Sequence, residues 1–396
     1  MQQEYRIYPV LTILKKTDTL LFMKVAIVHD WLVTFGGAER VVLQMLGMFP
    51  DADIYTLVYD EKKIGKYFPK EKVHTSFVQK FPMATKLYRK FLSLMPKAFE
   101  AFDLTGYDLV LASSSCCAKG VITSPDTAFV AYVHSPMRYA WDLYYDYFKN
   151  SGFLTRFFMK RQIPKIRQWD FISSQRIDRI CANSAYIARR IKKVWNRDAV
   201  VVHPPVDTNR LSPVNLPPED FYVVFSRFVS YKRIDLAIKA CGELNRKLVV
   251  IGDGPDAKSL KKLASSYRKN LITFTGRISD AEVKKYLQVC RALIFCAEED
   301  FGIIPVEAEA CGRPVIAYKK GGSLETVIDS KTGVFFEKQE VQSVMDAIGK
   351  FEELDSKERF KSTIIVRHAK NFSEESFRKN LLSVIDESLA EKGLSR

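Results

Sequence analysis

The sequence of 396 residues lacks several features that define other protein classes. It contains no uninterrupted apolar run of about eighteen residues, the length needed for a helix that spans a membrane. Its seven cysteines are an odd number without a CxxC pair, which favours a reducing compartment and argues against a structural zinc site. With only 18 glycines and 16 prolines, the chain is neither collagen-like nor of low complexity.

Negative charge is scarce compared with positive charge. The chain has 61 Lys and Arg against 46 Asp and Glu, a net charge of +15. Residues 1–200 contain 30 basic and 18 acidic residues, and the remainder contains 31 and 28, so the excess belongs mainly to the N-terminal half. An excess of this size favours an acidic partner, such as nucleic acid, anionic lipid or a phosphorylated ligand.

The apolar pattern predicts an α/β protein with two doubly wound domains, because short β-branched strands alternate with helical segments in both halves. Residues 203–220 contain five prolines and no strong periodicity, which predicts a linker. The expected strands are 24–30, 54–59, 107–114 and 127–134 in the first half, and 221–227, 247–254, 271–276, 291–297 and 313–318 in the second.

These patterns suggest domain boundaries. We expect a peripheral leader at residues 1–22, with Met23 as a candidate natural start, because the leader has no signal-peptide core or cleavage site. An N-terminal Rossmann-like domain is expected at 23–205 and a second at 206–372. The C-terminal segment 373–396 has helical periodicity and is expected to pack back on the first domain.

Two groups of polar residues follow predicted strands in the second half. Glu299 and Glu307 stand on either side of Gly302, where a helix amino terminus favours anions and hydroxyl groups. Acidic residues in a first helical turn are equally ordinary choices for the helix dipole. Arg227 and Lys232 follow an earlier strand, and two cations there suit a diphosphate, although single exposed basic residues in a loop are common.

The first half offers weaker signals. Gly37 belongs to a double-glycine turn after the first strand, which resembles an incomplete dinucleotide loop or serves only as a turn. His134 ends a strand and can stabilise charge or carry protons, but a structural histidine is the commoner case, and His29 ends a strand as well. Asp51 and Asp53 have a spacing seen in Mg²⁺ sites, but no other ligand is near, so we interpret them as a turn.

Two stretches combine aromatic and basic residues. They cover residues 87–99 and 144–169. Apolar side chains that alternate with cations are typical of a surface that docks on an anionic membrane. The alternative is an amphipathic helix that packs inward and leaves a basic face in solvent.

Five motifs together resemble glycosyltransferase family 4 and come in the order of that family: GGAER, HSP, SRFVSYKR, GDGP and EDFGIIPVEAEACGRPVIA. The resemblance extends from about Met23 to the C-terminal helix. It implies the GT-B fold, in which two Rossmann-like domains face each other across a cleft. The segments HDWLVTFGGAERV and VHSPMRYAWD are most similar to the O-antigen mannosyltransferase branch.

The resemblance implies a role for each matched residue. Glu307 would hold the nucleotide ribose, and Glu299 would hold hydroxyl groups of the donor sugar. Arg227 and Lys232 would bind the donor diphosphate and stabilise the leaving group, and His134 would line the reacting sugar. The catalytic set is thus His134, Arg227, Lys232 and Glu299, and the further donor-binding residues are Gly37, Gly254, Arg277, Phe301, Gly302, Ile303 and Glu307.

The implied activity is transfer of a hexosyl residue, with retention, from a nucleotide-sugar to a glycan acceptor. GDP-mannose is the preferred donor by branch resemblance, a polyprenyl-diphosphate-linked glycan of lipopolysaccharide synthesis is the expected acceptor, and no metal is required. We place the protein in the cytoplasm, peripherally on the inner face of the cell membrane. The alternatives are a UDP-sugar-dependent transferase, a sugar-phosphate synthase with a soluble acceptor, and a basic nucleic-acid-binding protein, for which the sequence has no motif.

Overall fold

The computed structural model describes residues 23–149 and 151–394. The leader expected at residues 1–22 lies outside the described residues. Within the described ranges, no helix is both long enough and apolar enough to cross a bilayer.

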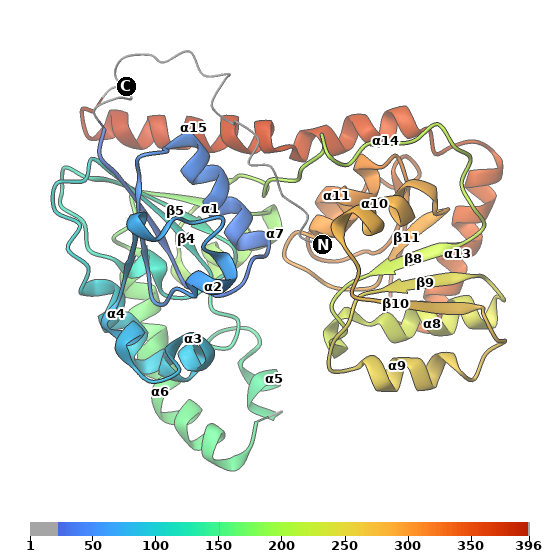
Figure 1. Cartoon of the computed structure of the whole chain (residues 1–396), viewed down its shortest axis with the longest axis horizontal. Coiled ribbons are helices and arrows are strands. Elements are labelled where there is room, and N and C mark those ends of the chain that lie inside the picture. Colours follow the sequence, from blue (N-terminus) through green and yellow to red (C-terminus); the bar gives the residue numbers. More distant parts are fainter. Residues whose placement is uncertain (1–22, 150, 395–396) are drawn as a thin grey trace. The chain divides into compact units, whose positions relative to one another are not determined.

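The chain forms two compact α/β units, each built around one parallel sheet (Figure 1). The first unit contains the residues up to Ala182, Ile187–Val201 and the residues from Arg378 onward. The second unit contains Asn183–Tyr186 and Val202–Phe377.

The sheet of the first unit has seven parallel strands in the order β3-β2-β1-β4-β5-β6-β7. The chain runs outward from β1 through β2 to β3, and it then returns to β4 and runs outward on the other side. The strand order therefore reverses between β1 and β4, and parallel sheets bind ligands at such a point. The strands are β1 (Val25–His29), β2 (Asp53–Thr56), β3 (Val73–Thr75), β4 (Leu109–Ser114), β5 (Ala128–Val133), β6 (Arg179–Ala182) and β7 (Val200–Val201).

Every residue of β1, β4 and β5 is buried, which agrees with the continuous apolar runs of these strands. The C-terminal helix α15 (Glu374–Glu391) belongs to the first unit from Arg378 onward, where Arg378 donates a hydrogen bond to Gln44. The other helices of the N-terminal half are α1 (Gly37–Met48), α2 (Glu61–Ile64), α3 (Ala84–Leu87), α4 (Met95–Glu100), α5 (Tyr144–Lys149), α6 (Phe153–Ser174) and α7 (Ala185–Trp195).

The sheet of the second unit has six parallel strands in the order β10-β9-β8-β11-β12-β13, so its order reverses between β8 and β11. The strands are β8 (Tyr222–Phe225), β9 (Leu248–Ile251), β10 (Ile272–Gly276), β11 (Ala292–Phe295), β12 (Val315–Tyr318) and β13 (Gly333–Phe336). The helices are α8 (Ile234–Glu243), α9 (Ala257–Ala264), α10 (Asp280–Val289), α11 (Ile303–Ala310), α12 (Ser323–Thr326), α13 (Val341–Ser356) and α14 (Ser362–Ala369).

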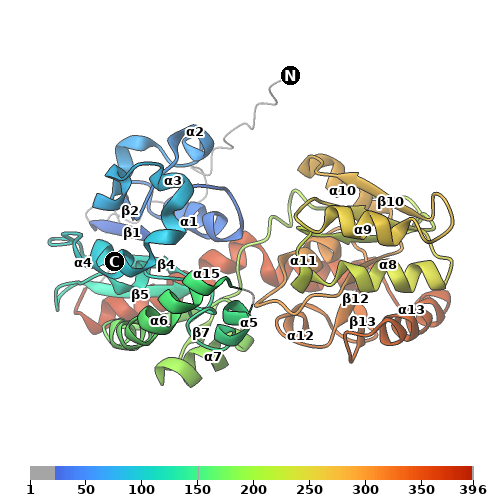
Figure 2. The same cartoon turned by 90° about the horizontal axis from the view of Figure 1, so that it is seen from below.

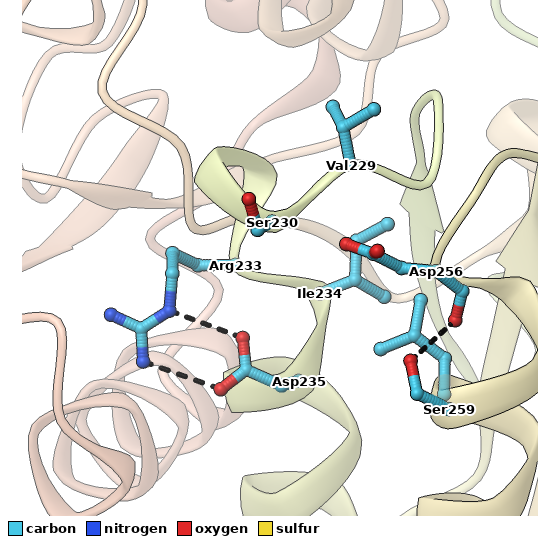
Figure 3. Close-up of a pocket in the computed structure, with 8 residues that line it drawn as sticks. Val229, Ser230, Arg233, Ile234, Asp235, Asp256 and Ser259 are labelled. Atoms are coloured by element: carbon cyan, nitrogen blue, oxygen red, sulfur yellow. Dashed lines mark hydrogen bonds and ion pairs between the residues drawn. The ribbon is translucent and has the colours of Figure 1, made fainter. Parts of the chain in front are cut away.

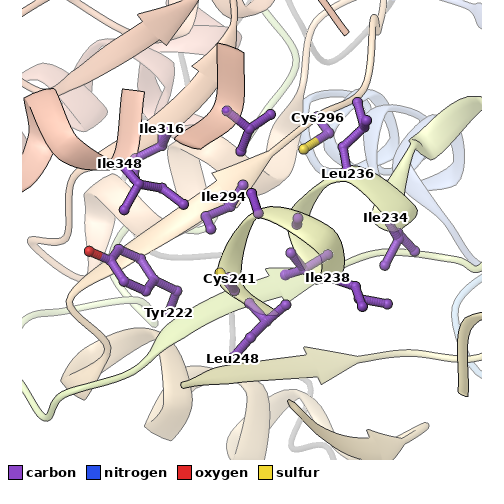
Figure 4. Close-up of a cluster of buried hydrophobic side chains, with 14 of the residues drawn as sticks. Tyr222, Ile234, Leu236, Ile238, Cys241, Leu248, Ile294, Cys296, Ile316 and Ile348 are labelled. Carbon is purple, nitrogen blue, oxygen red and sulfur yellow. The ribbon is translucent and has the colours of Figure 1, made fainter. Parts of the chain in front are cut away.

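Both faces of the second sheet are covered by helices, because successive strand residues point to opposite sides. Tyr222 and Val224 join a core formed with α8, α9 and α13, whereas Val223 joins a core formed with α10 and α11. Figure 4 shows the first of these cores, in which Ile294 of β11 lies near Cys241 of α8. Helices α8 and α13 lie side by side on this face (Figure 2).

The aromatic and basic segment 87–99 differs from the amphipathic helix that its periodicity suggests. It forms a 3₁₀ helix at Tyr88–Leu94 followed by α4. Tyr88, Met95 and Phe99 are buried, and no large apolar side chain of this segment is among the exposed ones. Its apolar residues therefore pack inward.

Lys119 and Asp170 form a buried ion pair inside the first unit. Lys119 Nζ lies 3.0 Å from Asp170 Oδ1, and both side chains are almost completely buried. Asp170 Oδ2 accepts hydrogen bonds of 2.7 Å from the indole N–H groups of Trp141 and Trp195. Lys119 also donates to Ser173 Oγ at 2.7 Å. These contacts offset the cost of removing both charges from water, and they attach α6 to α7 and to the short 3₁₀ helix after β4.

We expect the Lys119→Met substitution to lower the free energy of unfolding by about 3–5 kcal/mol, because it leaves the Asp170 carboxylate buried without a cation. Urea unfolding of the full chain measures this change. Lys357→Met is the control, since Lys357 pairs with Glu353 on an exposed helix face and should alter the midpoint little. Equal midpoints for the two variants would contradict the structural role of the buried pair.

Candidate functional site

Polar side chains meet at the carboxyl ends of the central strands in the first unit. His29, the last residue of β1, is the register partner of Ser113 in β4, and His134 directly follows β5. Ser113 Oγ lies 3.1 Å from His29 Nδ1 and 2.8 Å from His134 Nε2. The three side chains thus form a continuous hydrogen-bonded row where the strand order reverses, the usual place of a ligand site in a parallel sheet.

Glu39 connects this row to the double-glycine turn. Its Oε2 accepts a hydrogen bond from the backbone N–H of Gly36 at 2.9 Å, and its Oε1 lies 3.6 Å from His29 Nε2. Gly37, predicted to approach a phosphate or the acceptor, is the first residue of α1 and is exposed. Sequence reasoning missed Glu39, although an acid three residues after the residue preceding a helix is a recognisable capping pattern.

The imidazole of His134 is neutral at physiological pH. Burial, together with the smaller effect of the neighbouring His29, lowers the pKa of His134 to about 3. Of the two roles that the sequence leaves open for His134, charge stabilisation and proton transfer, the low pKa favours hydrogen bonding by the neutral ring.

Asp30 organises the segment 113–120 at the end of β4 and beyond it, whose sequence SSSCCAKG matches no motif. Its two carboxylate oxygens accept four backbone N–H groups at 2.6–2.9 Å, from Ser115, Cys116, Cys117 and Ala118. Asp30 therefore holds this loop against the end of β1. Sequence reasoning missed this residue as well, because its partners are more than eighty positions away.

The second unit brings together two of the residues predicted to bind the donor. Lys232 ends a 3₁₀ helix after β8, and its Nζ forms an ion pair with Glu299 Oε1 in the loop after β11. The two loops follow the two strands between which the order reverses. Arg227 lies on the same loop as Lys232, is exposed, and forms no ion pair with another residue that the structure describes.

Helix α11 places the second glutamate differently from the expectation. The sequence suggests that Glu307 lies in the first helical turn, but α11 begins at Ile303, so Glu307 lies in the second turn and the first contains no acid. Gly302 precedes the helix with φ 89°, a left-handed conformation that glycine adopts without strain. Helix capping therefore does not explain Glu299 or Glu307.

The side chain of Phe301 has a mainly structural role. It is 3% exposed and packs against the rings of His203 and Phe372. Gly322 follows β12, and its N–H donates a hydrogen bond to Glu299 O at 2.8 Å. A Cβ on Gly322 would lie 2.2 Å from Phe301 Cα, so only glycine allows this close support of the loop that carries Glu299.

The GDGP motif supports the neighbouring loop in the same way. A Cβ on Gly254 would lie 2.4 Å from the carbonyl oxygen of Phe228, and one on Gly252 would lie 1.9 Å from that of Ser226. The Phe228 N–H donates a hydrogen bond to the carbonyl of Asp253 at 2.9 Å. The glycines therefore let two backbones pack directly, which holds the loop that carries the two predicted cations.

Two further features lie apart from the ion pair. Arg277, a predicted donor ligand, follows β10 and is exposed. A cavity of about 310 Å³ lies at the start of α8 and α9, but Arg233 in its wall is already paired with Asp235 at 3.1 and 3.2 Å (Figure 3). None of the predicted site residues lines this cavity. Its walls are formed by Val229, Ser230, Arg233, Ile234, Asp235, Asp256, Ser259 and Leu260.

Asp53, one of the two aspartates with the spacing of a Mg²⁺ site, has ordinary structural partners. Asp53 lies in β2 and accepts hydrogen bonds from Tyr107 Oη at 2.6 Å and from His74 Nε2 at 3.2 Å. Within residues 23–149 and 151–394, no group of three or more His, Cys, Asp and Glu side chains is arranged to hold a metal ion.

Comparison with known proteins defines the fold class as GT-B. HepE from Anabaena, solved in complex with UDP, superposes with a TM-score of 0.68 at 17% identity over 92% of this chain and 100% of that one. Sucrose-phosphate synthase from Thermosynechococcus elongatus gives a TM-score of 0.69 at 17% identity over 93% of this chain and 100% of that one.

Two family models match consecutive parts of the chain. Glycosyltransferase Family 4 matches residues 35–210, and Glycosyl transferases group 1 matches residues 207–365. The chain belongs to glycosyltransferase family 4.

Curated relatives match over shorter stretches. A GDP-mannose-dependent alpha-(1-6)-phosphatidylinositol monomannoside mannosyltransferase of Mycolicibacterium smegmatis is 31% identical over 42% of this chain and 50% of its own length. A D-inositol 3-phosphate glycosyltransferase of Mycobacteroides abscessus is 29% identical over 54% of this chain and 53% of its own. The match thus spans about half the length of these relatives.

We expect the Gly254→Ala substitution to lower the free energy of unfolding by about 1–3 kcal/mol, because the added Cβ displaces the backbone of Phe228. Gly349→Ala is the control, since its Cβ on α13 would meet nothing within 4 Å and should raise stability by about 0.5–1 kcal/mol. Urea denaturation of both variants measures the difference. If Gly254→Ala is as stable as the native chain, the close packing of the two loops does not contribute to the free energy of unfolding.

Proposed function

We propose that the protein transfers a hexosyl residue from a nucleotide-sugar to a glycan acceptor, with retention at the anomeric carbon. The ion pair between Lys232 and Glu299 is the observation that supports this proposal most directly. It places a cation and a carboxylate together at the carboxyl edge of the second sheet, beside an α11 amino terminus. A nucleotide-sugar needs both kinds of group, because it carries a diphosphate next to several hydroxyl groups.

In the proposed reaction, the cations act on the leaving group. Negative charge develops on the nucleoside diphosphate as the bond to the sugar breaks, and Lys232 and Arg227 stabilise it. Glu299 exchanges part of its contact with Lys232 for hydrogen bonds from sugar hydroxyls. Glu307, buried in the second turn of α11, accepts from the ribose. The departing phosphate takes the proton of the acceptor hydroxyl, so no enzyme carboxylate has to act as a nucleophile.

GDP-mannose is the proposed donor. The support comes from relatives that are named as GDP-mannose-dependent mannosyltransferases at 31% identity. UDP-sugars are the competing donors, since HepE was solved with UDP. The proposal includes no metal, because Lys232 and Arg227 supply the positive charge that a cation would otherwise bring to the diphosphate.

A thermal unfolding series distinguishes these donors. A donor that binds only the folded chain raises the midpoint by mass action. We expect a larger rise with GDP-mannose than with UDP-glucose or dTDP-glucose at equal concentration. A larger rise with a UDP-sugar would reject GDP-mannose as the donor. That result would still agree with the transfer of a hexosyl residue.

We expect Lys232→Ala and Glu299→Ala each to reduce kcat/KM for transfer by at least about 100-fold, since removal of one preorganised electrostatic group typically has this effect. Both side chains are partly exposed, so the fold should persist, and circular dichroism checks it. Lys331→Ala is the control, because Lys331 is an exposed lysine of the same unit outside the site. Near-native turnover in either site variant would reject the assignment.

We further propose that the acceptor is lipid-linked, as a polyprenyl diphosphate, and that the first unit docks on the inner, anionic face of the cell membrane. The support is an apolar surface on α5 and the start of α6, where Tyr145, Phe153, Leu154, Phe157 and Phe158 are 55–84% exposed. Basic residues accompany them along α6, namely Arg156, Lys160, Arg161, Lys165 and Arg167. Aromatic side chains that insert beside cations at the headgroups suit such a surface.

Only one of the two stretches expected to dock retains this role. Residues 144–169 contribute the exposed aromatic side chains, whereas the apolar residues of 87–99 pack inward. The docking surface in this proposal therefore consists of α5 and the first half of α6.

We expect the double substitution Phe153→Ser and Phe157→Ser to reduce partitioning onto anionic vesicles at least about tenfold. Each aromatic ring that inserts into the membrane contributes about 1.5–3 kcal/mol to the free energy of binding. Co-sedimentation with phosphatidylglycerol vesicles and with neutral phosphatidylcholine vesicles, at two salt concentrations, measures it. Leu216→Ser is the control, since Leu216 is also exposed but lies in the second unit. Weak binding of the native chain to anionic vesicles would favour a soluble acceptor.

A further inference from the structure

A row of hydrogen-bonded side chains lies at the edge of the first sheet, and the partners within this row determine which ring nitrogens of its histidines carry protons. The row runs from Glu39 through His29 and Ser113 to His134. The first three side chains are almost completely buried, so each polar atom needs a partner of the opposite kind. An atom that can only accept a hydrogen bond requires a proton on its partner, and the positions of the protons follow from this rule.

His29 is the starting point. Its Nδ1 lies 3.1 Å from the backbone carbonyl oxygen of Ser113. A carbonyl oxygen only accepts, so Nδ1 of His29 carries a proton and donates. The other ring nitrogen, Nε2, lies 3.6 Å from Glu39 Oε1, so this carboxylate faces the far side of the ring.

The hydroxyl group of Ser113 transmits this constraint. Its Oγ lies 3.1 Å from His29 Nδ1 and 2.8 Å from His134 Nε2. Because His29 Nδ1 is a donor, the Ser113 hydroxyl accepts there. Among the described residues the only other partner of this fully buried hydroxyl is His134 Nε2, so the Ser113 hydrogen is donated to that nitrogen. That nitrogen is then unprotonated, and the single proton of the neutral His134 ring lies on Nδ1.

We propose that Glu39, His29 and Ser113 are positioning residues that hold His134 in the Nδ1–H tautomer. A hydrogen bond from this imidazole to a sugar oxygen is then donated by Nδ1, and Nε2 cannot act as a base because it accepts from Ser113. The statement about the sugar rests on the proposed function, whereas the tautomer itself does not.

The low pKa of His134 agrees with a neutral ring, and a contact of Glu39 extends the row to the glycine turn. Burial lowers the pKa of His134 to about 3, so the ring has one proton and a definite tautomer at neutral pH. Glu39 also accepts from the Gly36 N–H, so the glycine turn and the imidazole are held by one carboxylate. The row therefore aligns two predicted site elements that are about a hundred residues apart in the sequence.

The test is the ¹⁵N spectrum of the histidine rings in the full chain at neutral pH. The chain has only five histidines, so the His134→Gln variant identifies the His134 signals by their loss. In the native chain we expect a protonated Nδ1 and an unprotonated Nε2 for His134. A protonated Nε2 would overturn the proposal without any variant.

Two serine variants on the same strand form a matched pair. Ser113→Ala removes the donor to Nε2 and should shift His134 toward a mixture of tautomers. Ser114→Ala removes a buried hydroxyl on the opposite face of the sheet, for which the described residues offer no hydrogen-bond partner, and should leave the spectrum unchanged. Ser113→Thr restores the hydroxyl and should restore the native tautomer. Unchanged His134 signals in Ser113→Ala would contradict the role of Ser113.

Activity adds a second readout. We expect Ser113→Ala to lower kcat for transfer about tenfold with little change in the KM for the donor, and Ser113→Thr to recover most of it. The spectrum requires no substrate, so its failure and the failure of the proposed function are distinguishable. If the spectrum is as expected but the chain has no transferase activity, the tautomer assignment stands and the proposed function is rejected.

Discussion

The reversal of strand order at the centre of each sheet is the constraint on which the rest of the structure depends. Two neighbouring parallel strands send their chains to opposite sides at this point, so their carboxyl ends are not covered by a crossing connection. In the first unit this leaves His29 and Ser113 together, and in the second it leaves the loops of Lys232 and Glu299 together. The residues that a ligand requires come from segments far apart in the sequence.

Loops at these edges are supported by close backbone packing and by hydrogen bonds. Asp30 satisfies four backbone N–H groups of the loop after β4, and glycines at 252, 254 and 322 allow backbones to touch where a side chain would collide. Such support aligns charged side chains before a ligand binds, which reduces the reorganisation that binding would otherwise require. In the buried pair of Lys119 and Asp170, two indole N–H groups that donate to Asp170 accompany the ion pair.

Much of the fold and part of the site were accessible from the sequence. Apolar, β-branched runs predict buried parallel strands, and the strands expected at 24–30 and 127–134 correspond to β1 and β5. Ordered motifs predict the family, which the two family models confirm. Asp30 and Ser113 escaped prediction, because their significance depends on contacts with residues from other strands, and periodicity carries no information about such contacts. Glu39 had a local capping signal, but its contact with His29 had none.

By itself, the sequence determined the alternation of strands and helices, the family and the residue types available for chemistry, because these depend on local pattern and composition. Only the tertiary structure decided which residues meet. It separated the inward-packed segment 87–99 from the exposed aromatic surface of α5 and α6, although both have the same mixture of aromatic and basic residues. It also moved Glu307 into the second turn of α11, because the left-handed conformation of Gly302 sets where that helix begins. Burial and register are properties of the packed chain, and they arise only when distant segments come together.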